Sequence, residues 1–358
     1  MTYDPDRRNL MLSLGGLSAL ALVARPCLAM PEAAMSTRDA SHDFDFFLGS
    51  WDVHHRRLKT RLAGANDWEA FGGATMCRPL MGGLANINDS IVERPGEMYR
   101  SLGLRAYDAK SGNWADWSLS GRDPTSIDPP GIGRFERGVG TFLSDDMLEG
   151  KPIKVRGRFS SPNPRLARWE QAFSGNGGMS WETNWAMNFT RTSATVTPLA
   201  HDESAPRDWD FLVGSWSVAH RRLKHRLVGN NEWQSFTGTL VNWPLLGGMS
   251  NVGDNVMNFP ADAYRGIGLR AFDAKAGQWL SWWLDGRDPL SLAVPMRGSF
   301  SGGVGTMTGT DTQDGRPILV RVIWSRITPI SARWEQASSA DNGATWETNW
   351  ISDFTRQA

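Results

Sequence analysis

The chain is poor in the residues that build disulfides and metal sites. It contains 2 cysteines and 6 histidines among 358 residues. Cys27 falls in an N-terminal segment that reads as an export signal, which leaves Cys77 alone in the mature chain. One thiol cannot form an internal disulfide, so stability must come from hydrophobic cores. Neither histidine nor cysteine is clustered at metal-ligand spacing, and we expect no metal site.

An excess of charge is also lacking. The 38 basic and 38 acidic residues give a formal net charge of +0, which argues against nucleic acid or an anionic membrane as the main partner. The chain has no phosphate loop, no dinucleotide fingerprint and no Gly-x-Ser-x-Gly elbow. We therefore expect no nucleotide cofactor, and no cofactor of another kind is indicated.

Long apolar runs are confined to the N-terminus. Arg7-Arg8 resembles a twin-arginine motif, an apolar run follows from Leu10 to Val23, and Cys27-Leu28-Ala29 offers small residues for cleavage. The run is shorter than the roughly 20 residues of a membrane span, which disfavours the alternative of an anchor. We predict a twin-arginine-type signal peptide at 1–29 and a polar linker at 30–42. The mature protein should then be periplasmic or secreted, with no stable membrane insertion.

What the chain has in abundance is an internal repeat rich in tryptophan, of which there are 18. Gly49-Ser50-Trp51 returns as Gly214-Ser215-Trp216, at an offset of 165 residues (216 − 51) that holds without a gap. Such self-similarity indicates an internal duplication. The predicted units are 43–191 and 208–356, joined by a linker at 192–207.

Each unit shows short segments of aromatic and β-branched residues separated by turn residues, with hardly any helical period. This pattern predicts an all-β fold of two tandem antiparallel barrels or sandwiches, and we favour barrels. One short helical turn is expected near 44–48, capped by Ser41 or Asp43. The nine or so strands expected in the first unit lie near 51–62, 67–77, 84–93, 99–108, 113–120, 134–143, 151–160, 166–174 and 181–190.

Gly49-Ser50-Trp51, placed after a short helical turn, resembles the Gly-x-Trp motif of the lipocalins and the wider calycins. The leading Phe-Leu-x-Gly-Ser-Trp and the closing Trp-Glu-Thr-Asn-Trp resemble a little-characterised bacterial calycin-like domain. The resemblance implies a barrel whose Trp51 packs against an arginine from the last strands, Arg191 or Arg168. The second lipocalin motif, an Asp-Tyr pair, is missing, which leaves strict lipocalin topology open. The corresponding arginines of the second unit are Arg356 and Arg333.

Polar residues kept in both units are the candidate site residues. His55 and Arg57 share a strand face with Trp51, and they would line the barrel if that face points inward throughout. A bulge near His55 would instead turn Leu58 and Leu62 inward, and the leucine pair favours this alternative. His55 is the best acid–base candidate, although a structural histidine and solvated cations are the competing explanation. The corresponding residues of the second unit are His220 and Arg222.

Glu182 and Asn184 lie in the repeated segment 181–185. With its tryptophans inward, the segment is a core strand whose Glu and Asn pair with Arg168. With Glu182 inward, it becomes a candidate general base, and Asn184 a candidate ligand contact. The corresponding residues are Glu347, Asn349 and Arg333.

A third repeated group, Arg105, Trp117 and Arg122, is a candidate ligand-binding set. Arg122 begins a loop that runs Pro-rich through Pro129-Pro130-Gly131, and such a loop can act as a lid at a barrel mouth. The alternatives are a turn held by an Asp side chain and structural stacking of Arg on Trp. The corresponding residues are Arg270, Trp282 and Arg287.

The residues therefore favour an exported protein that holds a small, largely apolar and possibly anionic molecule inside its barrels. One alternative is a cofactor-independent enzyme, such as a lyase, hydratase, isomerase or cyclase, in which a barrel-lining His works with Arg or Glu. Another is a structural or assembly module that binds nothing small. The ligand, the oligomeric state and the activity of each copy are left open by the sequence.

Overall fold

A computed structural model describes residues 39–260 and 262–357. The predicted signal at 1–29 and most of the predicted linker at 30–42 lie outside the described residues. None of the helices in this part of the chain is long and apolar enough to cross a membrane.

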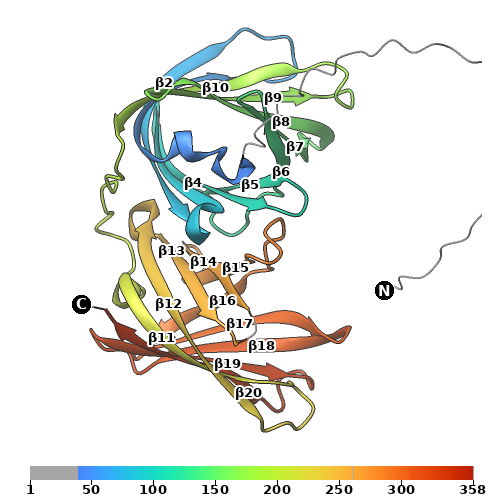
Figure 1. The fold of residues 1–358 in the computed structure, drawn as a ribbon. Helices are drawn as coiled ribbons and strands as arrows, with labels where there is room; N and C mark the ends of the chain where they lie inside the picture. The colour runs from blue at the N-terminus through green and yellow to red at the C-terminus, as the bar shows by residue number, and fades with distance from the viewer. Residues whose placement is uncertain (1–38, 261, 358) are drawn as a thin grey trace, which may run out of the picture. The chain divides into compact units, whose positions relative to one another are not determined.

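Two closed antiparallel barrels of ten strands each follow one another along the chain (Figure 1), which confirms the predicted fold class. In each barrel every strand pairs with its sequence neighbours, and the first strand also pairs with the last. The strands of the first barrel are β1 (Gly49–Leu58), β2 (Trp68–Leu80), β3 (Ala85–Arg94), β4 (Glu97–Asp108), β5 (Asn113–Ser120), β6 (Gly131–Glu136), β7 (Val139–Leu148), β8 (Lys151–Asn163), β9 (Leu166–Ser174) and β10 (Glu182–Ser193). Those of the second are β11 (Gly214–Leu223), β12 (Trp233–Leu245), β13 (Ser250–Asn258), β14 (Ala263–Asp273), β15 (Gln278–Asp285), β16 (Met296–Ser301), β17 (Val304–Gln313), β18 (Arg316–Ser325), β19 (Ser331–Ser339) and β20 (Glu347–Arg356).

The tenth strand arises where the sequence predicts one strand over 134–143. The chain there forms a hairpin between β6 and β7, with Glu136 paired to Val139. The two linking residues, Arg137 and Gly138, both have positive φ, 51° and 82°, as a two-residue hairpin turn requires. Arginine seldom occupies such a position, so the sequence signal for this turn was weak.

The inward face of β1 continues without a flip. Trp51, Val53 and His55 are buried, whereas Asp52 and His54 between them are exposed. The register shift in the β1–β10 pairing falls between Ser50 and Trp51, before this alternation begins. The expected bulge near His55 is therefore wrong, and the histidine points toward the barrel interior.

Short 3₁₀ turns close one end of the first barrel. Asp45–Phe47 places Phe44 and Phe47 in a buried cluster with Trp114 and Phe159, and the turn lies within the ring of strands (Figure 1, dark blue). The preceding turn, Ala40–His42, is capped by Asp39, which accepts from the Ser41 amide. The turn predicted near 44–48 is Asp45–Phe47, and its N-cap position is taken by Phe44 and not by Ser41 or Asp43.

Arg191 fastens this closed end to the first and last strands. Its guanidinium lies 4.0 Å from the Trp51 ring centroid, and its N–H groups donate to the carbonyls of Phe46, Leu48 and Pro164. In the second barrel, Arg356 lies over Trp216 at 4.3 Å and makes the corresponding bonds. Arg191, rather than Arg168, has the position that the lipocalin resemblance implies.

The outward faces of β3–β5 and β13–β15 are apolar and share one hydrophobic cluster, to which Leu104 and Leu269 belong. Two buried aspartates make equivalent contacts across it. Asp89 accepts from the Leu246 amide at 3.0 Å, and Asp254 accepts from the Met81 amide at 3.1 Å. Because each pair is the 165-residue repeat of the other, the two copies contact each other through the same surface.

Replacement of Arg191 by Met removes a cation–π contact and three hydrogen bonds while it keeps the apolar stem. We expect Arg191→Met to lower the free energy of unfolding by about 3 kcal/mol, as measured by urea denaturation. Arg134, whose side chain is 64% exposed, offers a matched control, and Arg134→Met should change stability by less than about 0.5 kcal/mol. Equal effects of the two substitutions would show that the contacts of Arg191 do not stabilise the fold.

Candidate functional site

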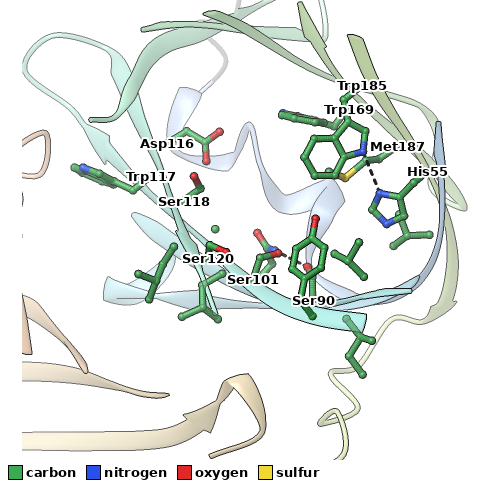
Figure 2. A pocket seen from close by; sticks show the side chains of 18 of the residues that line it. His55, Ser90, Ser101, Asp116, Trp117, Ser118, Ser120, Trp169, Trp185 and Met187 are labelled. Atoms are coloured by element: carbon green, nitrogen blue, oxygen red, sulfur yellow. Dashed lines mark hydrogen bonds between the residues drawn. The ribbon is translucent and has the colours of Figure 1, made fainter. Parts of the chain in front are cut away.

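The interior of the first barrel contains a cavity of about 240 Å³. Its two walls differ in chemistry. One wall is formed by β3, β4 and β5 and carries hydroxyl, amide and carboxylate groups, and the other is formed by β8, β9, β10 and β1 and is mostly aromatic. Figure 2 shows the serines of the first wall across the open space from Trp169, Trp185 and Met187. The cavity is therefore amphipathic.

The polar wall holds a row of hydroxyl groups. Thr75, Ser90, Ser101 and Ser120 are direct cross-strand partners on four successive strands, β2 to β5. Ser118 precedes Ser120 on the same face of β5 and is exposed to the cavity. The opposite face of β5 carries the buried apolar residues described above, and this alternation turns the serines inward.

Hydrogen bonding within the row leaves capacity for a ligand. The Ser118 hydroxyl donates to Asp128 at 3.1 Å, and the Ser120 hydroxyl accepts from the Arg122 amide at 3.3 Å. The Ser101 hydroxyl has no hydrogen-bond partner among the described residues. The row therefore offers both donors and acceptors.

Arg105 lines the cavity, and its buried guanidinium is paired with a carboxylate and bonded to two amides. Its guanidinium is 3.0 Å from the Asp116 carboxylate and donates to Asn86 and Asn88 at 3.0 and 2.9 Å. Its carbon Cζ lies 4.9 Å from the Phe159 ring centroid. Burial raises the pKa of Asp116, although Arg105 lowers it in part. The predicted site residue Arg105 thus lines the cavity as half of a neutralised ion pair.

Arg122 lies at the mouth of the cavity, also paired. It donates to both carboxylate oxygens of Glu97, at 3.0 and 3.1 Å, and stacks on Tyr99 at 4.0 Å. Arg57 covers Trp185 at 4.8 Å and is not among the residues that line the cavity. Burial lowers the pKa of Arg57, and Arg61 beside it lowers it further.

His55 lines the cavity as a neutral, packed ring. It stacks on Phe71 at 4.7 Å, and the Trp185 indole N–H donates to its Nδ1 at 3.2 Å (Figure 2). Because indole nitrogen can only donate, Nδ1 must accept, and the proton of the neutral ring lies on Nε2. Burial lowers the His55 pKa to about 4. His220 repeats the stack and the Trp350 bond, adds a bond to Ser352 at 2.8 Å, and has its pKa lowered by burial to about 4.

Glu182 and Asn184 lie apart from the cavity lining. Glu182 accepts from the Leu62 amide at 2.6 Å, and this contact holds a loop whose Leu62 has a φ of 55°. Asn184 is fully buried. Arg168 pairs with Asn188 and Glu170 rather than with either of them, so the expected pairing is wrong. In the second copy, Glu347 accepts from the Leu227 amide, Asn349 bonds Ser338 and Gln336, and Arg333 pairs with Asp353.

Trp117 belongs to the outward apolar cluster, as does Trp282 in the second copy. Trp117 also borders the cavity. The loop after β5 is held by Asp123, which accepts from the Thr125 amide at 3.3 Å and from its hydroxyl at 2.5 Å. This is the turn that the sequence offered as an alternative to a lid.

In the second barrel several of the corresponding interior positions carry larger side chains. Trp283 replaces Ser118, and its ring lies so close to Gly266 that a Cβ there would be 2.2 Å from it. Trp324 replaces Phe159 and packs on Trp209 at 5.5 Å. Arg270 lacks a carboxylate like Asp116, because Ser281 takes that place, and Arg287 pairs with Asp285. Both indole rings stand where smaller side chains, Ser118 and Phe159, line the cavity of the first barrel.

A further ring closes the second barrel near its His. Phe259, which replaces Arg94, stacks on Phe236 at 4.0 Å, and its centroid lies 6.1 Å from that of Trp350. Arg222 lies over both Phe259 and Trp350, at 5.7 and 4.9 Å.

Sequence reasoning found His55, Arg105, Trp117 and Arg122, which line the cavity, but missed its serines and Asp116. Ser101, Ser118, Ser120 and Asp116 differ between the two copies, whereas the candidates were chosen because they are repeated. The available signal was the polar and apolar alternation of 115–120, which marks β5 as a strand with a polar inner face.

No family model and no curated protein matches the chain. Among solved structures it is similar to a DUF3598-family protein of unknown function from Nostoc punctiforme, with 12% identity, coverage of 89% of this chain and 100% of that one, and a TM-score of 0.28. It is also similar to a double mutant of transferrin binding protein B from Haemophilus parasuis (7% identity, 86% and 76% coverage, TM-score 0.19). A third similar structure is a putative AttH from Nitrosomonas europaea (9% identity, 85% and 91% coverage, TM-score 0.14). At these TM-scores the likenesses carry no argument about function.

We expect His55 and His220 to titrate near pH 4 in the folded protein, compared with about 6.5 in the unfolded chain. Protons then bind preferentially to the unfolded chain, so a stability contribution of about 3 kcal/mol per histidine is complete above pH 6.5 and is lost as the pH falls toward 4. Imidazole ¹⁵N chemical shifts measured against pH test this, with urea-unfolded protein as the control. A folded-state pKa near 6.5 for either ring would contradict the burial account.

Proposed function

We propose that this is an exported binding protein that holds a small molecule inside its first barrel. The observation that carries the proposal is the amphipathic cavity, whose lining of aromatic side chains with a few convergent polar groups is typical of ligand sites. The resemblance of Gly49-Ser50-Trp51 to the calycin motif, and the placement of Arg191 on Trp51, support membership in a calycin-like family. Calycins mostly bind small apolar molecules.

The side chains that line the cavity change the ligand chemistry that we expect. Its aromatic wall suits a molecule with an apolar face, as the Trp content suggested. An anionic end is less favoured, because both cavity-lining arginines have carboxylate partners, Arg105 with Asp116 and Arg122 with Glu97. We therefore propose a ligand without net charge.

Binding is favoured over catalysis at this site. A general base works best with a pKa near the operating pH, and burial lowers the pKa of His55 to about 4. The nitrogen Nδ1 is also occupied by the Trp185 indole. The export assignment rests on the N-terminal residues 1–29, and we propose a periplasmic or secreted location on that basis.

The sequence of the second barrel suggests substitutions that would fill the cavity of the first. Ser101→Gly combined with Ser118→Trp transfers the Trp283 and Gly266 arrangement into the first barrel, where the new ring should fill the cavity without a clash. We expect native mass spectrometry of the parent protein, exported from a host with its own signal, to show a bound small molecule that the double variant lacks. Leu143→Trp, at a 51% exposed position, controls for an added tryptophan and should retain it.

Retention of the bound mass by the double variant would place the ligand outside the first barrel. A parent protein that carries no small molecule under native conditions would count against the binding function itself.

A further inference from the structure

The polar wall of the cavity has a pattern that restricts the chemistry of the ligand, given the proposed binding function. Ser101 and Ser120 are direct cross-strand partners, and Ser118 lies two residues from Ser120 on the same strand face. Opposite cross-strand residues have Cβ atoms roughly 5 Å apart. Three hydroxyl groups at this spacing can each reach a different substituent of one small ring.

The hydrogen-bond state of each hydroxyl is set by its protein contacts. The Ser118 hydroxyl donates its hydrogen bond to Asp128, so its oxygen can accept one from a ligand. Ser120 accepts from the Arg122 amide, so its proton can be donated. Ser101 has no partner among the described residues and is free to do either. The row therefore alternates acceptor and donor capacity.

Such a row matches one kind of ligand group better than others. A carboxylate or phosphate offers acceptors alone, and an ammonium group offers donors alone. A hydroxyl group both donates and accepts, and it complements a wall that does the same. The arginines of the cavity lining are paired, as described above, and leave no unbalanced positive charge for an anion to meet. Asp128 also lines the cavity, accepts from Ser118 and has no ion-pair partner among the described residues.

The opposite wall sets the other face of the ligand. Trp169 and Trp185 meet edge to face at 5.8 Å, and the Trp185 N–H is already bonded to His55. This wall therefore presents ring surface to the cavity, which suits the C–H face of a ring. The cavity volume of about 240 Å³ lies below the usual range for drug-sized ligands.

We propose that the first barrel binds a neutral, polyhydroxylated ring of monosaccharide size, with its hydroxyl edge on Ser101, Ser118 and Ser120 and its C–H face on Trp169 and Trp185. The second barrel does not share this site, because Gly266, Trp283 and Asp285 replace the three serines.

Tryptophan fluorescence titration with three ring probes of similar size tests this proposal. The probes are methyl β-D-glucopyranoside, which is hydroxylated, methylcyclohexane, which is apolar, and cyclohexanecarboxylate, which is anionic. We expect the glucoside to bind most tightly, and Ser101→Ala and Ser120→Ala each to weaken it by about 3- to 10-fold. Ser144→Ala, a serine of β7 outside the cavity lining, is the matched control and should leave binding unchanged.

The remaining outcomes separate this proposal from the binding function. If methylcyclohexane or the carboxylate binds better than the glucoside and the Ser101→Gly/Ser118→Trp variant abolishes that binding, the cavity is a ligand site but the hydroxylated-ring proposal is overturned. Glucoside binding that Ser101→Ala and Ser120→Ala leave unchanged overturns it as well. If none of the three probes binds and the parent protein carries no ligand from its host, the binding function falls together with it.

Discussion

Each barrel depends on the contact between an arginine of its last strand and the tryptophan of its first. Arg191 covers Trp51 and bonds the carbonyls of the 3₁₀ turn, so one side chain joins β10, β1 and the segment that closes the barrel end. A guanidinium has five N–H donors in a rigid fork, and lysine has no equivalent geometry. Phe44 and Phe47 fill this end of the barrel, and Phe47 also forms part of the cavity lining.

The duplication allowed the two interiors to diverge while the framework stayed the same. Both copies have the arginine–tryptophan contact and the His–Trp hydrogen bond. Both also have a glutamate that accepts from an amide of the loop after the first strand. The inner faces of β5 and β15 differ, with Ser118 in one and Trp283 in the other. Because the shared apolar cluster joins the outward faces, the second barrel can support the first whatever its own interior holds.

This division also explains how much the sequence could predict. The constant offset, the turn residues and the Gly-x-Trp motif were sufficient for two tandem barrels and for an arginine on Trp51, although they left Arg191 and Arg168 as alternatives. The number of strands was missed because Arg137-Gly138 is an unusual two-residue turn. The inward direction of His55 was missed because Leu58 at the strand end is buried as well. His55 and Leu58 lie on opposite faces of a regular strand, and the sequence does not show which face points inward.

The cavity could not be predicted from repetition. Many residues kept in both copies build the framework, since framework contacts are needed twice. Repeated residues such as Trp169 and Trp185 also line the cavity, whereas Ser101, Ser118 and Ser120 are specific to one copy. Glu182 illustrates the point, because its carboxylate bonds the Leu62 amide and its repeat Glu347 bonds Leu227. Divergence between the duplicates here marks the polar wall of the cavity, and repetition marks the framework and the aromatic wall.

A crystal structure of the exported protein with its co-purified molecule would test the central claim most directly. The amphipathic cavity predicts ligand density inside the first barrel, between the serines of β4 and β5 and the tryptophans of β9 and β10. Density inside the second barrel, or in the hollow lined by residues 125–130 and 290–295, with the first barrel empty, would contradict it.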